Sequence, residues 1–408
     1  MTTLTPRLET IFRETRTVCF GRFVITVPAS ATVVYGPAQA ESEIFYYSGD
    51  AGKVDQLVQA RILEVEKEGL FLMESDKQRL PLFGKVKDGI REGQKIVIGS
   101  KLQSGYTVHS YIPVGADLFV QYFSGILPDQ DPFDAVNAVA RRLTSRLPDF
   151  IPAEPGVCIE GGFIAKDMMY EQATIGIRLK EFPDVHLSVD VHKNLQFLPE
   201  QNELEVSLKQ GEEEARQRAG GGVFDRIRIF RHGTRQLGKW KGFEHASRMP
   251  AYEKNTDTHE FYFHAIGAIN DRLLPQLDIQ LDTGVKDDNK AGVEPSITDE
   301  EALALWDKLI NTIRARQPGD ATPVKTQVPL SSLTKTGASC PETGWWECME
   351  HASITGGRRR MFAVGEIMPP VFHVAEPNLW QKMTGNRSTF QISTTWKLVD
   401  YAKYRAPE

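Results

Sequence analysis

The sequence has little cysteine, no excess of positive charge and no long run of hydrophobic residues. Four cysteines in 408 residues are too few for a scaffold held together by disulfides, although their even number leaves pairing open. Lys and Arg number 48 against 54 Asp and Glu, and this net charge of −6 argues against nucleic acid or anionic lipid as a partner. The longest uncharged stretch, residues 23–40, contains Pro28, Gly36 and Pro37, which excludes a membrane-spanning helix there.

A secretory signal is the alternative interpretation of the same N-terminal region. The order of such a signal is present: the basic residues Arg13, Arg16 and Arg22, then the run FVITV, then the small residues 29–31. The apolar run is about five residues long, whereas a signal needs about 7 to 15, and it ends at Pro28. A strand that follows a turn at Gly21 explains these residues better, so we expect no export signal in this segment.

Motifs for catalysis, nucleotide binding and metal binding are also missing. The sequence has no G-x-S-x-G elbow, no G-x-x-x-x-G-K-[ST] loop and no G-x-G-x-x-G after a predicted strand. His259 and His264 in HEFYFH are five positions apart, whereas two histidines that bind zinc from one helix are four apart. His186 and His192 would lie about 20 Å apart along one strand. We therefore expect no enzyme, no cofactor and no metal site.

What the sequence contains is an order of strands and helices typical of folded domains. Hydrophobic residues make up 41% and charged residues 25% of the chain, as in average globular proteins. Runs rich in β-branched and aromatic residues predict strands over 16–49, and the apolar periodicity predicts a helix over 54–67. A strand meander then leads to a helix over 132–146, which Asp131 can cap. The PAEPG stretch that follows places a domain boundary near residue 150.

The same order of elements occurs again after residue 156 and ends in a helix with capping-box spacing between Thr298 and Glu301. We expect an α+β fold of two related domains, 1–150 and 151–318, each a mainly antiparallel sheet with packed helices. A linker rich in Pro, Thr and Ser follows at 319–338. The last piece, 339–408, is predicted to be a small β-rich module and contains four of the six tryptophans.

The cysteines form two candidate pairs. Cys340 and Cys348 bracket PETGWWE, and they could close a short disulfide loop or remain two buried thiols; the sequence favours neither. Cys19 and Cys158 each lie in the first predicted strand of their domain, in TVCFGRF and GVCIEGG. A bridge between the two domains is therefore a second and weaker prediction.

Several segments resemble a known family. TRTVCFGRFVITVPASATVVYG, PGVCIEGGFIAKD, ATIGIRLKEFPDVHLSVDV and RHGTRQLGKWKGFE resemble the two-domain immunity proteins that neutralise the fourth class of type VI secretion lipase effectors. The similarity covers about residues 10–317. The C-terminal piece, with CPETGWWECMEH and GGRRRMFAVGEIMPP, is similar to a small Trp-rich module found on type VI secretion tip and immunity-related proteins.

The resemblance implies a non-enzymatic inhibitor that binds a phospholipase effector, blocks access of substrate and acts in the periplasm. The cytoplasm is the alternative compartment, because no leader is recognisable in the sequence. The alternative function is an adaptor or structural component of the secretion apparatus, which would dock on a tip protein through the Trp-rich module.

Candidate anchors for a protein interface follow from residue type. Trp and Arg dominate the energetics of protein interfaces, which makes Trp240, Arg231 and Arg235 candidates, with packing of Trp240 on its own sheet as the alternative. Trp345 and Trp346 are adjacent, so in a strand only one of them points inward. The other is either a recognition surface or covered by the basic run 358–360 through a cation–π contact.

Overall fold

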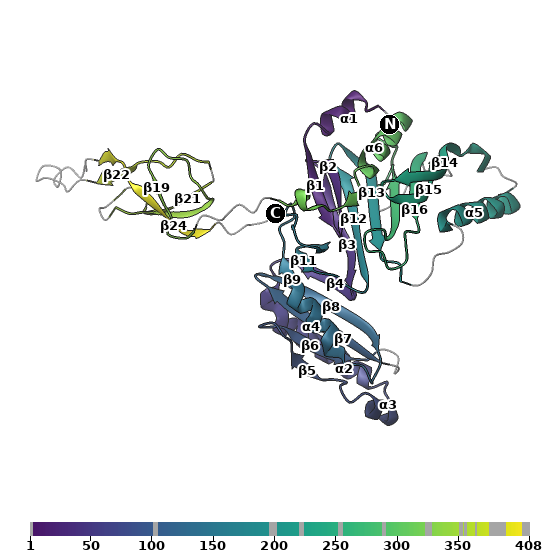
Figure 1. The fold of residues 1–408 in the computed structure, drawn as a ribbon, viewed down its shortest axis with the longest axis horizontal. Helices are drawn as coiled ribbons and strands as arrows, with labels where there is room; N and C mark the ends of the chain where they lie inside the picture. The colour runs from purple at the N-terminus through teal and green to yellow at the C-terminus, as the bar shows by residue number, and fades with distance from the viewer. Residues whose placement is uncertain are drawn as a thin grey trace, which may run out of the picture. The chain divides into compact units, whose positions relative to one another are not determined.

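The computed structural model describes residues 3–100, 105–195, 202–219, 224–251, 256–287, 291–322, 329–350, 354, 357–363, 365–374 and 389–401. The chain divides into two compact units, Met1–Thr322 and Pro323–Glu408 (Figure 1). Parts of the expected linker and of the Trp-rich module, including Trp380, lie outside the described residues. Within the described residues, no helix is both long and apolar enough to span a membrane.

The first unit contains the same series of elements twice. After the short helix α1 (Pro6–Ile11), the first repeat consists of β1 (Thr15–Phe20), β2 (Phe23–Pro28), β3 (Thr32–Ala40), β4 (Ser42–Tyr47), α2 (Val54–Gly69), α3 (Glu74–Arg79), β5 (Val86–Asp88), β6 (Lys95–Gly99), β7 (Tyr106–Val114), β8 (Asp117–Ile126), α4 (Pro132–Arg142) and β9 (Leu143–Ser145). The second repeat consists of β10 (Gly156–Ile159), β11 (Gly162–Ala165), β12 (Glu171–Leu179), β13 (Phe182–His192), α5 (Glu203–Ala219), β14 (Arg228–Leu237), β15 (Trp240–Met249), β16 (Thr258–Ala265), β17 (Gln276–Asp282), α6 (Asp299–Ile310) and β18 (Arg314–Ala315). The expected α+β fold is confirmed.

One antiparallel sheet of twelve strands joins the two repeats. Its order is β14-β15-β16-β17-β13-β12-β3-β4-β8-β7-β6-β5, with β12 and β3 paired at the centre. From that pair outward, the strands of both repeats follow in corresponding order. The connection near residue 150 therefore lies between two halves of a continuous sheet.

The hairpins β1–β2 and β10–β11 are exchanged between the repeats. Strand β2 pairs with β18 of the second repeat, and β11 pairs with β9 of the first. Phe20 accordingly packs in one core with Trp306 of α6, whereas Ile164 packs in another core with Val139 of α4. In Figure 1, β2 lies beside α6, which it also contacts. Each repeat therefore covers one face of the other repeat's half of the sheet.

The helices begin where the sequence predicts, for identifiable reasons. The Asp131 side chain accepts a hydrogen bond from the backbone N–H of Phe133 at 2.8 Å, which caps α4. Thr298 and Glu301 form the expected capping box at the start of α6. The helices α4 and α6 lie on one face of the sheet. On the other face, α2 packs on β6 and β7 in the first repeat, and α5 packs on β16 in the second.

The described part of the second unit is built of β-strands. Its sheet has the order β19-β24-β20-β21, formed by β19 (Leu333–Lys335), β20 (Gly344–Cys348), β21 (Arg359–Phe362) and β24 (Thr395–Tyr401). A separate hairpin consists of β22 (Val371–Val374) and β23 (Thr389–Ile392). Trp346 and Trp396 are fully buried in the core of this unit.

Candidate functional site

A groove lies over the first repeat, on the face of the sheet that α2 covers in part. Its volume is about 800 Å³, and it is lined by side chains of β4, β7, β8 and α2. Phe45 and Tyr47 alternate with inward-facing residues along β4, and both remain 44% exposed. Tyr122 lies on the same face, with its ring centroid 4.8 Å from that of His109. The groove thus presents aromatic side chains, which are enriched at protein interfaces.

The floor of the groove holds a buried arginine that pairs with two glutamates. Arg61, only 8% exposed, forms ion pairs with Glu68 at 2.7 Å and Glu64 at 2.9 Å. Burial, and secondarily the Arg61 charge, lowers the pKa of His109 to about 4. Burial raises the pKa of Tyr111 to about 12. His109 and Tyr111 are therefore neutral at pH 7, and the charges that line the groove come from Glu43, Asp50, Lys53, Arg61 and Glu68.

The corresponding position in the second repeat is polar. A cavity of about 510 Å³ lies between α5 and strands β12, β13, β16 and β17. Asp190, Asp278, His264 and Tyr262 line it, and the groove in the first repeat has aromatic side chains at the corresponding strands. The repeat therefore provides two equivalent positions with different chemistry.

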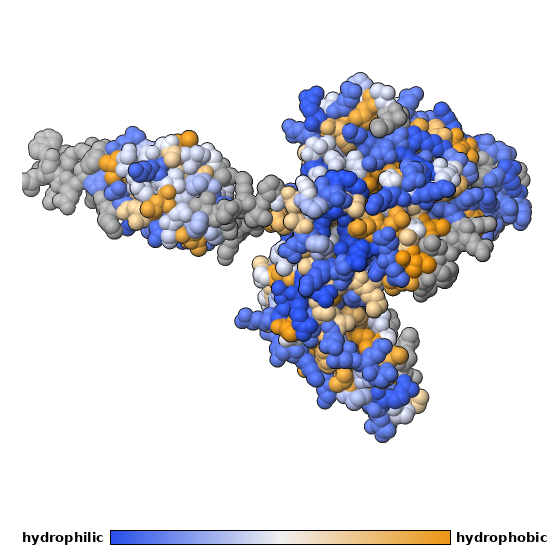
Figure 2. All heavy atoms as spheres, viewed as in Figure 1, coloured by the Kyte–Doolittle hydropathy of each residue, from blue (hydrophilic) through white to orange (hydrophobic). Residues whose placement is uncertain are grey.

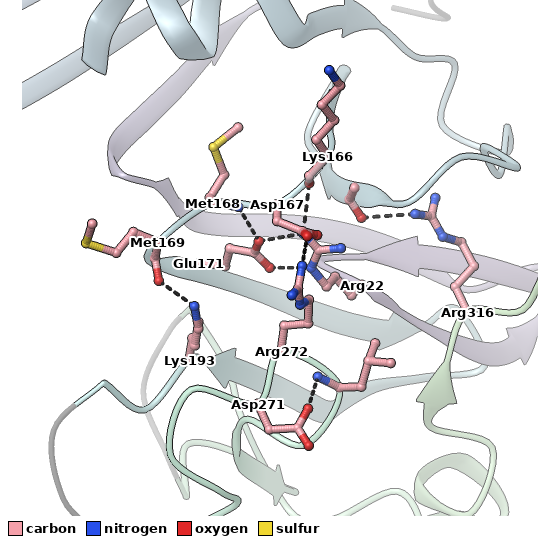
Figure 3. Close-up of polar contacts among 12 residues, drawn as sticks. Arg22, Lys166, Asp167, Met168, Met169, Glu171, Lys193, Asp271, Arg272 and Arg316 are labelled. Atoms are coloured by element: carbon pink, nitrogen blue, oxygen red, sulfur yellow. Dashed lines mark hydrogen bonds and ion pairs between the residues drawn. The ribbon is translucent and has the colours of Figure 1, made fainter. Parts of the chain in front are cut away.

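A buried ion pair joins the exchanged hairpin β1–β2 to the second repeat (Figure 3). Arg22, 6% exposed, binds Glu171 through two contacts, Nε to Oε2 at 2.5 Å and Nη2 to Oε1 at 2.6 Å. Arg22 also lies 3.1 Å from Asp167, which pairs with Arg272. Bidentate geometry of this kind is the strongest form of an arginine–carboxylate pair. The cluster is well suited to fix the hairpin in place, and its charges are satisfied internally.

A disulfide between Cys19 and Cys158 joins the two exchanged hairpins. The N–H of Gly21 donates to the carbonyl of Cys158, and the N–H of Cys158 donates to the carbonyl of Gly21. Arg316 lies beside both sulfurs and donates hydrogen bonds to the carbonyls of residues 152, 154 and 156. Burial, together with Arg22 and Arg146, lowers the pKa of Arg316 to about 10.

The pair Cys340 and Cys348, the stronger of the two disulfide predictions, is not bonded in the structure. Both are buried free thiols. Cys340 Sγ donates to the carbonyl of Glu342 at 3.1 Å, and Cys348 Sγ contacts Thr394 Oγ1 at 3.2 Å. Each thiol has its own hydrogen-bond partner in the core of the second unit. The structure therefore contains the bridge that was the weaker prediction, Cys19–Cys158, and lacks the one that was the stronger.

The three anchor candidates of β14 and β15 have internal roles. Trp240 is 3% exposed, its ring lies 5.3 Å from that of Phe23, and its Nε1 donates to the carbonyl of Pro275. Trp240 is therefore a core residue, as the alternative interpretation held. Arg231 binds Asp307 at 2.7 Å and 2.8 Å, and Arg235 binds the same carboxylate at 2.9 Å. These arginines tie β14 to α6.

The adjacent tryptophans of β20 face opposite ways. Trp346 is fully buried, whereas Trp345 is 38% exposed. The guanidinium of Arg359 lies 5.3 Å from the Trp345 ring centroid, so a residue of the predicted basic run does cover it. On the face shown in Figure 2, hydrophobic residues form small patches separated by hydrophilic ones.

The aromatic groove was not predicted from the sequence. The signal that could have revealed it is the segment EIFYY, where Phe45 and Tyr47 occupy alternate positions of a strand that also needs one buried face. Which face is buried depends on the pairing of β4 with β8, and that pairing joins residues more than seventy positions apart.

Comparisons with known proteins give one family and one fold. Residues 150–318 match the family model described as the Tle cognate immunity protein 4 C-terminal domain. The structure of the immunity protein TplEi of the T6SS from Pseudomonas aeruginosa, complexed with "L" peptide, is 22% identical with a TM-score of 0.56, covering 74% of this chain and 99% of that chain. The Tle4-Tli4 complex contains a chain 21% identical with a TM-score of 0.58, covering 74% of this chain and 97% of that chain. No curated protein matches.

Proposed function

We propose that this chain is an immunity protein that binds a phospholipase effector of a type VI secretion system and blocks access of substrate to it. The observation that carries the proposal is the match of residues 150–318 to the Tle cognate immunity protein 4 family. The fold shared with TplEi and with a chain of the Tle4-Tli4 complex supports it over 74% of the sequence. A protein that neutralises by binding needs no nucleophile and no cofactor of its own.

The aromatic groove is the surface that we assign to the effector. Phe45 and Tyr47 are large, exposed and on the same face of β4, and Arg61 and His109 form a partly buried floor beneath them. A few aromatic anchors in a concave site supply most of the binding energy of a typical protein interface. A segment of the effector that enters this groove would be held by such anchors.

The periplasm is the compartment that we assign to this activity. The bond between Cys19 and Cys158 supports the assignment, because disulfides persist in oxidising compartments and are rare in the cytosol.

The tip protein remains a predicted second partner of the Trp-rich module.

The test is a lipase assay on the effector encoded beside this gene, with this protein at equal concentration, together with gel filtration of the mixture. Two substrates separate the modes of inhibition: a small water-soluble ester and phospholipid vesicles. Blocked access to the active site predicts inhibition with both substrates. Inhibition with vesicles alone would show that the protein acts by keeping the effector from the membrane, and would contradict blocked access.

Variants locate the interface within the same assay. Phe45→Ala combined with Tyr47→Ala is expected to weaken binding at least about tenfold, because each removes an aromatic anchor. Phe372→Ala is the matched control, since Phe372 is 47% exposed in the second unit. An unchanged affinity in the double variant would move the interface away from the groove and leave the immunity function intact. Absence of both complex and inhibition would contradict the proposed function.

A further inference from the structure

The polar cavity of the second repeat brings carboxylates and imidazoles together across neighbouring strands. Antiparallel pairing places Asp190 of β13 directly opposite Asp278 of β17, and Asp278 opposite His264 of β16. His192 lies two residues beyond Asp190 on the same strand and therefore on the same face. Like charges directly opposite each other on a sheet are destabilising, and each aspartate has a histidine nitrogen at hydrogen-bond distance, His192 for Asp190 and His264 for Asp278.

Asp190, His192 and Asp278 have the geometry of a set of metal ligands. One ligand atom from each residue can be chosen such that all three lie within 4.8 Å of one another. His192 Nδ1 and Asp190 Oδ1 lie 3.0 Å apart as a hydrogen-bonded pair, and an ion bound by both atoms would replace this hydrogen bond. All three side chains are partly buried, and the carboxylates line the 510 Å³ cavity.

The second carboxylate oxygens are held by other side chains. Thr174 Oγ1 and Gln172 Nε2 donate to Asp190 Oδ2 at 2.5 Å and 3.0 Å. Gln276 Nε2 donates to Asp278 Oδ2 at 3.3 Å. Hydrogen bonds of this kind orient the carboxylates of metal sites and tune their affinity.

His264 lies beside this cluster and lines the same cavity. It is 5% exposed, its Nδ1 lies 2.5 Å from Asp278 Oδ1, and its Nε2 is buried without a hydrogen-bond partner among the described residues. A buried imidazole paired with a ligating carboxylate matches the outer shell of a metal site, and Glu203 of α5 lines the same cavity.

We propose that Asp190, His192 and Asp278 bind a divalent transition metal ion, with zinc as the expected ion. One imidazole nitrogen and two carboxylate oxygens are ligands that Zn²⁺ accepts, and solvent in the cavity can complete the coordination. The ion would neutralise the facing aspartates and link β13 to β17. The site is structural, and it is independent of the effector-binding groove, which lies on the first repeat.

The test is titration of the chelator-treated full-length protein with ZnCl₂ in a calorimeter and with CoCl₂ in a spectrophotometer. We expect one ion per chain, visible Co²⁺ absorption bands and a higher melting temperature with zinc. Asp278→Asn and His192→Gln should each weaken binding at least about tenfold, because each removes one of three protein ligands. His186→Gln, on the same strand β13 six residues away, is the matched control and should bind as the wild type does.

Two results would overturn the proposal. One is the absence of binding to the wild type, and the other is unchanged affinity in both ligand variants. X-ray absorption at the zinc edge of the wild type decides the case if the variants fail to fold. A shell of nitrogen and oxygen supports the site, whereas sulfur ligands would place the ion at the free thiols Cys340 and Cys348 and contradict it.

Discussion

Removal of the disulfide between Cys19 and Cys158 should strongly destabilise the first unit without changing its fold. The bond connects residues 139 positions apart. In the chain-entropy model, a closed loop of this length lowers the entropy of the unfolded chain by an amount worth about 5 kcal/mol at 25 °C. Native disulfides typically contribute about 2 to 5 kcal/mol. The variant Cys19→Ala/Cys158→Ala should lose free energy of unfolding within this range.

The native arrangement should persist in that variant, because other contacts hold the exchanged hairpins. The reciprocal backbone hydrogen bonds between Gly21 and Cys158 do not require the sulfurs. The Arg22–Glu171 pair continues to fix the turn of the β1–β2 hairpin against β12. The change is therefore expected in stability rather than in the circular dichroism spectrum or in effector binding at 25 °C.

Hydrogen exchange measured by mass spectrometry is the suitable assay, because it reports on each unit of the full chain separately. The slowest amides of β1 and β10 give the free energy of opening of the first unit, and those of β20 serve as an internal reference. Reductant should destabilise the wild type and leave the alanine variant unchanged. A loss smaller than about 0.5 kcal/mol in the variant would refute the reasoning.

Three further predictions concern single side chains. Arg22→Met should destabilise the first unit by about 3 to 5 kcal/mol in urea unfolding, because it leaves Glu171 buried without its partner, and adding Glu171→Met should recover part of the loss. Because the pKa of His109 is lowered in the folded protein, the unfolded chain binds a proton more readily at this position. The free energy of unfolding should therefore fall by up to about 3 kcal/mol as the pH drops from about 6.5 to 4. Urea titrations of His109→Phe should show a smaller decrease over the same pH range. In the second unit, Trp346→Ala should cost about 3 to 5 kcal/mol, whereas Trp345→Ala should cost about 1 kcal/mol or less by hydrogen exchange.

The local part of the fold could be predicted from the sequence. Capping of α4 by Asp131 and the box of Thr298 and Glu301 depend on residues within one helical turn, and both are confirmed. The opposite orientations of Trp345 and Trp346 follow from the two-residue period of a strand. These features need no knowledge of which strands pair.

The candidate sites could not be predicted, because they depend on pairing between distant strands. Asp190 and Asp278 lie on β13 and β17, which are separated by α5 and three further strands along the chain. Histidine spacings along single strands fit no metal site, because this cluster forms only across paired strands. Trp240 is buried in the core rather than exposed as an interface anchor, and the sequence could not show this because the hairpin that covers it comes from the other repeat.

The exchange of hairpins explains why the first unit behaves as one body despite its internal repeat. Phe20 and Phe23 complete the core above β12 and β13, and Val157 and Ile164 complete the core of the first repeat. Burial of each large apolar side chain stabilises by about 1.5 to 3 kcal/mol, so neither repeat has a complete core without the hairpin of the other. The proposed effector groove on one half and the proposed metal site on the other are therefore carried by a single sheet, and the disulfide and Arg22 fix the exchanged hairpins near its centre.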